Sequence, residues 1–235
     1  MEWVKNVILE MTENIFIKDP QAGEKIDFLK TNLSPATSNL RCEENRFAIN
    51  CVGILLHRLA ENKYGPSSID AKKISTQPRF HGSRSRVGVT LSTPEFPDVV
   101  HMVCLGSTVH SWEQLFYEVA HESLHLLGPA DIKSTPVATL EEGAAVKFAE
   151  SFYSEYILPA IGTPPPLSPL NSPDSVYYRA YQCANKIPDE TLKKIRQKFK
   201  NFREVKYEGL QELVKDFITE KEIKILVSPF DYSAH

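Results

Sequence analysis

The chain has 235 residues, of which 42% are hydrophobic, enough for one sizeable core; its formal net charge of −3 excludes the strongly basic surface typical of nucleic-acid-binding proteins. No apolar run reaches the length of a membrane span, and the N-terminal stretch, residues 1–13, contains acidic residues and no small-residue cleavage site, unlike a signal peptide. We therefore expect a cytoplasmic protein with neither a nucleic-acid nor a membrane partner.

The first hundred residues contain one clear helix and two short strands. Residues 3–17 mix alternation with apolar runs, and their Val, Ile and Phe content slightly favours extended structure. Residues 43–63 have helical apolar spacing that ends before Gly65-Pro66, which predicts a long helix. The runs at 86–91 and 99–105 are of β type and are expected to form a hairpin or adjacent strands. The four cysteines show no metal-binding spacing, and no disulfide is expected.

The segment from Ser111 to Pro129 is the most informative part of the chain. Ser111 followed by Gln114 is a capping-box pattern, and Gly128-Pro129 ends the helix. At about 100° per residue, one stripe of this helix holds most of its ionisable side chains, and nearly all the rest is apolar. The stripe consists of Glu118, His121, Glu122 and His125. This pattern predicts a buried helix that lines a cleft.

The four side chains of this stripe suit a metal ion. Carboxylates and imidazoles in a cleft cost several kcal/mol per uncompensated charge, and a divalent cation would remove that cost. His121 and His125, at i and i+4, can direct two ring nitrogens at one ion. Glu122 would lie beside the ion, where it can take a proton from water. This HExxH pattern predicts a hydrolytic metal site.

An open zinc site takes three protein ligands, so a third is expected shortly downstream. Residues 139–159 are predicted to form a second helix, opened by a capping box between Thr139 and Glu142. Glu142 stands at the head of an otherwise apolar, Ala-rich face, which makes it the preferred third ligand. Glu141, about 100° away around the helix, and Glu150 are the alternatives.

The remainder of the chain is expected to be helical after an interruption. Residues 159–173 contain too many prolines for regular structure and are predicted to be a rigid, extended connection. Three helical segments and a strand-like run follow: 174–186, 189–205, 207–219 and 222–227. We divide the chain into a catalytic region, residues 1–158, this connection, and a C-terminal helical region, residues 174–235, that packs on the same domain.

The two central helices resemble the zinc metallopeptidases of the gluzincin type, in which a Glu on the helix after HExxH completes the site. Residues 140–145 (LEEGAA) are similar to the N-E-G-x-A signature of the aminopeptidase branch, and the sixteen residues between His125 and Glu142 are close to its spacing. Residues 142–149 also resemble the ExxAxxFA helix of ImmA/IrrE-type intracellular metallopeptidases. Both resemblances give Glu142 the same role.

The resemblance implies a zincin-like α+β fold, mostly helical, with a small sheet flanking the HExxH helix. It implies one Zn²⁺ with three protein ligands: His121, His125 and Glu142. A peptide bond would be hydrolysed by zinc-bound water that Glu122 activates, and Tyr178 or Tyr181 would stabilise the oxyanion. A peptide or protein substrate would lie extended along one of the two predicted strands. Residues 81–86 form either a mobile polar loop or an overhang of the cleft with His81, Arg84 and Arg86.

Two departures narrow the expected activity. Thermolysin-like members place an Asp four residues after the ligand Glu to orient a His, whereas Val146 occupies that position here. The aminopeptidase branch has an upstream GxMEN-type motif that grips the substrate's amino terminus, and nothing here matches it. We therefore expect a narrowly specific intracellular endopeptidase. The alternative is a non-catalytic regulatory or protein-binding protein that retains the metal site as a structural element.

Overall fold

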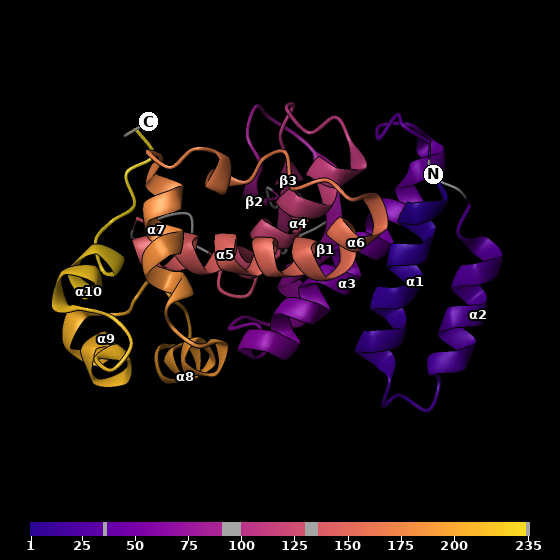
Figure 1. Cartoon of the computed structure of the whole chain (residues 1–235). Coiled ribbons are helices and arrows are strands. Elements are labelled where there is room, and N and C mark those ends of the chain that lie inside the picture. Colours follow the sequence, from indigo (N-terminus) through magenta and orange to yellow (C-terminus); the bar gives the residue numbers. More distant parts are fainter. Residues whose placement is uncertain (35–36, 91–99, 130–135, 234–235) are drawn as a thin grey trace.

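A computed structural model describes residues 1–34, 37–90, 100–129 and 136–233 of the chain (Figure 1). The helices are α1 (Glu2–Phe16), α2 (Ala22–Asn32), α3 (Arg46–Tyr64), α4 (Trp112–Leu126), α5 (Thr139–Phe152), α6 (Leu158–Ile161), α7 (Val176–Asn185), α8 (Asp189–Phe199), α9 (Tyr207–Val214) and α10 (Glu220–Leu226). The strands are β1 (Ile74–Phe80), β2 (Arg86–Val89) and β3 (His101–Leu105). The predicted α+β class, mostly helical with a small sheet, is confirmed.

The N-terminal segment is a helix, so the preference for extended structure in residues 3–17 was wrong. Its fully buried side chains recur at helical spacing on the face that packs against α3: Val4, Val7, Ile8 and Met11. Packing on that face outweighs the β preference of valine and isoleucine. The predicted helix at 43–63 is confirmed as a 3₁₀ turn, η1 (Glu43–Asn45), followed by α3, which ends at Gly65 with φ 95°.

The sheet has the strand order β1-β3-β2, with β3 parallel to β1 and antiparallel to β2. The pairing of Arg86 with Cys104 and of Val89 with His101 confirms the two predicted strands as neighbours, while residues 91–99, which include the whole stretch between the two predicted runs, lie outside the described residues. All five residues of β3 are buried because the strand is central. As an outer strand, β2 has one edge that no other described strand pairs with.

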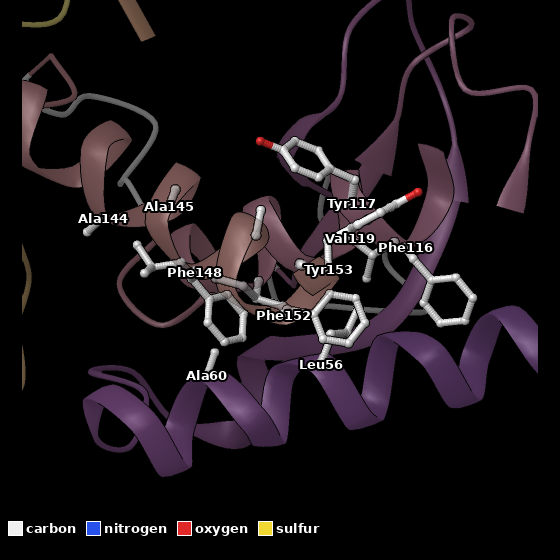
Figure 2. Close-up of a cluster of buried hydrophobic side chains, with 14 of the residues drawn as sticks. Leu56, Ala60, Phe116, Tyr117, Val119, Ala144, Ala145, Phe148, Phe152 and Tyr153 are labelled. Atoms are coloured by element: carbon white, nitrogen blue, oxygen red, sulfur yellow. The ribbon is translucent and has the colours of Figure 1, made fainter. Parts of the chain in front are cut away.

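The core between α3, α4 and α5 holds the two central helices together. Figure 2 shows buried side chains of all three helices gathered in one cluster, among them Leu56 of α3, Phe116 of α4 and Phe152 of α5. The rings of Phe116 and Phe152 lie 6.1 Å apart, and those of Tyr64 and Phe148 lie 6.0 Å apart. Aromatic pairs of this kind add about 0.5–1.5 kcal/mol each beyond the area that they bury. The packing therefore sets the position of α4 relative to α5.

The C-terminal region packs against α5 through α7 and α10. A Cβ at Gly143 would lie 2.5 Å from the carbonyl oxygen of Ala180, so glycine permits the close approach of α5 and α7. The predicted strand at 222–227 was wrong, because residues 222–226 belong to α10 and Val227 caps its end; the start of α10 is fixed by a capping box between Thr219 and Glu222.

Residues 159–173 are less extended than predicted. They contain the end of α6 and a 3₁₀ turn, η4 (Pro169–Asn171). The four cysteines are free. Among the described residues, no helix combines the length and the apolar character needed to cross a membrane.

Candidate metal centre

Helix α4 has the boundaries that the sequence predicts. Ser111 accepts a hydrogen bond from the Gln114 backbone, and the Gln114 side chain accepts one from the Ser111 backbone, which completes the capping box. The helix then places His121 and His125 one turn apart, with their Nε2 atoms separated by 3.2 Å. Two ring nitrogens therefore face the same point.

Helix α5 begins at Thr139, but the predicted capping box between Thr139 and Glu142 is absent. The backbone nitrogen and the hydroxyl of Thr139 instead donate to the carbonyl of Ser228, at 2.9 and 3.0 Å. Ser228, in the C-terminal segment, thus accepts the hydrogen bonds of Thr139 at the start of α5. Glu142 is left free to turn toward the histidines.

His121, His125 and Glu142 form one cluster, in which their potential ligand atoms all lie within 4.8 Å of one another. Glu142 is buried, with Oε2 3.2 Å from His121 Nε2 and Oε1 3.5 Å from His125 Nε2. Despite this contact, Oε2 accepts no well-directed hydrogen bond among the described residues. Two convergent ring nitrogens and a carboxylate oxygen without a donor suit a divalent cation, and an N₂O donor set suits Zn²⁺. The residues therefore fit the metal that the resemblance implies.

The cluster is strongly coupled electrostatically. Burial alone would raise the pKa of Glu142, but attraction to His125 and His121 outweighs it and holds the pKa well below its usual value. Burial raises the pKa of the neighbouring Glu122 to about 7, against the opposing charges of the same histidines. Glu122 thus borders the cluster as a buried carboxyl group whose pKa lies near neutrality.

Glu141, the first alternative ligand, contacts the other side of His125. Its Oε1 lies 2.8 Å from His125 Nδ1, and both of its oxygens accept from Arg203, at 2.6 and 3.0 Å. The buried Glu141 therefore contacts Nδ1 of His125, whereas Nε2 is the ring nitrogen that faces His121 and Glu142. Sequence reasoning missed Arg203, because nothing in its Lys/Arg-rich run, 193–203, separates a buried arginine from its solvated neighbours.

Glu150, the second alternative, lies outside the cluster. It accepts hydrogen bonds from the hydroxyls of Tyr117, at 2.7 Å, and of Ser168. Ser168 immediately precedes η4, so Glu150 anchors the Pro-rich segment to α4 and α5. This segment is a wall of the cleft described next.

A cleft of about 1010 Å³ opens onto the cluster. Its floor includes Glu118, Glu122 and the three clustered residues, one wall is residues 83–87 with β2, and the other is the Pro-rich segment 166–175. Arg84 and Arg86 line it, whereas His81 is not among its described lining residues.

Backbone contacts hold the first wall in place. His81 N donates to Leu105 O at 2.9 Å, Ser107 N donates to Gly82 O at 3.0 Å, and Gly106 N donates to Ser85 Oγ at 3.1 Å. These bonds tie residues 81–85 to the segment after β3. Of the two interpretations of this loop, the overhang of the cleft fits better for Arg84 and Arg86.

The tyrosines of the cleft differ from those predicted. Tyr178 and Tyr181 are not among its described lining residues, whereas Tyr177 lines it, with its ring 6.3 Å from that of His121. Tyr232 also lines the cleft, and its hydroxyl donates to Glu142 Oε1 at 2.7 Å. Tyr232 lies in an irregular segment after α10, where periodicity gives no signal.

Comparisons with protein-family models, with curated proteins and with solved structures give no match to this chain. Its function is therefore inferred from the chemistry of the site.

Proposed function

We propose that this chain is a zinc-dependent metallopeptidase of zincin-like fold, acting as a narrowly specific endopeptidase on a peptide or protein substrate inside the cell. One observation carries the proposal: the His121–His125–Glu142 cluster and the carboxylate of Glu122 border the same large cleft. A metal-dependent hydrolase needs a metal site with an accessible position and a proton acceptor beside it. Both requirements meet at one place in this protein.

His121, His125 and Glu142 would hold the ion. Bound there, a zinc ion lowers the pKa of water and polarises the carbonyl group of a substrate. Glu122 takes the proton from the attacking water and delivers it to the leaving amine. Tyr177, in place of Tyr178 or Tyr181, donates a hydrogen bond to the oxygen that becomes negatively charged.

The principal alternative is a non-catalytic protein in which the metal only stabilises the fold. Structural zinc sites are usually closed by four protein ligands. Among the described residues the cluster offers three, and it borders a cleft large enough for several substrate residues. These features favour the enzyme.

The test compares the wild type with Glu122→Gln and His125→Ala. Metal analysis of the purified proteins is expected to find about one zinc per chain in the wild type and in Glu122→Gln, and much less in His125→Ala. Cleavage of a proteome-derived peptide library, followed by sequencing of the new amino termini, is expected for the wild type. The rate should fall about 10²- to 10⁴-fold in Glu122→Gln, because the proton acceptor is lost.

Unchanged turnover of Glu122→Gln would exclude Glu122 as the base. A folded wild type that retains its zinc but cuts none of the library would favour the structural alternative.

A further inference from the structure

Arg203 lies between α8 and α9, and its side chain is only 6% exposed. A buried guanidinium is costly unless a carboxylate pairs with it and its N–H groups are hydrogen-bonded. Glu141 provides the carboxylate and accepts from Arg203 Nη2 and Nε at 2.6 and 3.0 Å, while the buried Nη1 has no hydrogen-bond partner among the described residues. This two-point contact leaves Glu141 little freedom to rotate.

The fixed Glu141 carboxylate in turn contacts Nδ1 of His125, at 2.8 Å. A hydrogen bond to one ring nitrogen sets both the tautomer and the orientation of an imidazole. With Nδ1 engaged by Glu141, Nε2 of His125 is the nitrogen that faces His121 and Glu142. Arg203 is thus connected to the cluster through Glu141, which it contacts, and through His125, which Glu141 contacts.

A second contact comes from the segment after α10. Ser228 accepts two hydrogen bonds from Thr139, and Phe230 N donates to Val137 O at 2.8 Å, so this segment is paired with the chain that leads into α5. The ring of Phe230 packs on that of Tyr232, with their centroids 4.9 Å apart. The Tyr232 hydroxyl then donates to Glu142 Oε1 at 2.7 Å. The other oxygen, Oε2, lies 3.2 Å from His121 Nε2 but accepts no well-directed hydrogen bond among the described residues.

We propose that Arg203 and Tyr232 are positioning residues that orient His125, through Glu141, and Glu142, and that they thereby set the metal affinity of the site. The inference rests on the metal site of the proposed function. The potential ligands all lie in α4 and α5, yet Arg203 lies 62 residues after its partner Glu141, and Tyr232 lies 90 residues after Glu142. Residues after α8 are therefore part of the metal centre without contacting the ion.

The test measures zinc affinity of the full-length, metal-free protein by competition with a chromophoric chelator. Arg203→Met and Tyr232→Phe are each expected to weaken zinc binding about 10- to 100-fold, the usual effect of losing such an orienting partner. For Arg203, the direction of the change in zinc affinity distinguishes a positioning role from a purely electrostatic one. If the arginine acted only through its charge, its removal near a cation site would strengthen zinc binding.

Two variants serve as matched controls. Tyr64→Phe deletes a tyrosine–carboxylate hydrogen bond, to Asp189 at 3.2 Å, that is outside the cluster. Lys198→Met removes a positive charge near Arg203 in sequence, one that pairs with Glu212 on the surface. Both are expected to retain wild-type zinc affinity.

Two further readouts separate positioning from a general structural role. Cobalt-substituted protein reports ligand geometry through its visible absorption bands, which should shift in Arg203→Met and Tyr232→Phe while far-UV circular dichroism stays unchanged. In a double-mutant cycle, Glu141→Gln and Arg203→Met should be non-additive, because they break one chain of contacts.

Full zinc affinity in a folded Arg203→Met or Tyr232→Phe variant would overturn the inference for that residue. A wild type that binds no zinc would instead refute the metal site itself, so the two failures are distinguishable.

Discussion

Tyr177 and Tyr178 are adjacent in α7, yet only Tyr177 lines the cleft. If Tyr177 donates a hydrogen bond to the oxyanion, Tyr177→Phe should lower kcat about 100-fold, as the loss of such a donor does in other hydrolases. Zinc content should not change, because Tyr177 is not a metal ligand. The measurement is steady-state cleavage of a peptide identified from the library, together with metal analysis.

Tyr178→Phe is the matched control for this prediction, since it removes the same hydroxyl from the next residue of the same helix. It should leave kcat and zinc content at wild-type values. Equal losses in both variants would point to damage to α7 and would contradict a specific role for Tyr177.

Some side chains of the site were predictable from the sequence and others were not. The positions of His121, His125 and Glu142 follow from two periodic helices close together in the chain, and the structure brings these residues together. Their role as ligands stays a prediction. Arg203 and Tyr232 come from distant irregular segments, and Tyr177 differs from the predicted Tyr178 by one position on a helix. Local periodicity cannot specify which side of α7 packs on α5.

At the scale of elements, Arg196 joins the ends of two helices to α8. Its guanidinium donates to the carbonyls of Tyr64, the last residue of α3, of Gly65 and Pro66, which follow it, and of Leu127 after α4. Burial lowers the pKa of Arg196 to about 10, so the group remains charged at neutral pH. Arg196→Met should lower the free energy of unfolding by about 3 kcal/mol, because buried carbonyls lose charged donors.

Urea denaturation of the metal-free protein measures this loss. Lys193→Met is the control: Lys193 lies on the same helix, but the hydrogen bond of its side chain, to Asn62 O at 3.4 Å, is exposed. It should cost less than about 0.5 kcal/mol. Similar urea midpoints for the wild type and Arg196→Met would contradict this prediction, because they would mean that water can replace the hydrogen bonds that Arg196 donates to the four carbonyls.

The sequence predicted α3, α4 and α5 because their apolar spacing and their ends agree, whereas α1, β1 and α10 show where such reasoning stops. In α1 the β-branched residues favoured a strand, although the buried side chains have helical spacing. The strand β1 contains Gln77, Pro78 and Arg79, and these residues interrupt the apolar pattern by which a strand is recognised in a sequence. The register of its pairing with β3 shifts between Ser75 and Arg79. The shift accommodates Pro78, which has no N–H to donate.

For the molecule as a whole, the buried core is continuous from α1 to α10, and it includes Val4 near one end and Leu226 near the other. The candidate site depends on this continuity, because its ligands lie in α4 and α5 while its orienting side chains come from beyond α8. A C-terminal region that unfolded on its own would remove Arg203 and Tyr232 from the cluster. We expect the metal-free chain to unfold as one cooperative unit.

Both tryptophans, Trp3 and Trp112, lie in the part of the chain before α5, so their fluorescence reports that part, whereas far-UV circular dichroism reports every helix. The two urea transitions should share one midpoint, as two-state unfolding requires. If α7 to α10 unfolded first, ellipticity would fall before the fluorescence changed. That outcome would separate the C-terminal region from the core and would predict a zinc affinity that weakens at urea concentrations where α4 and α5 are still folded.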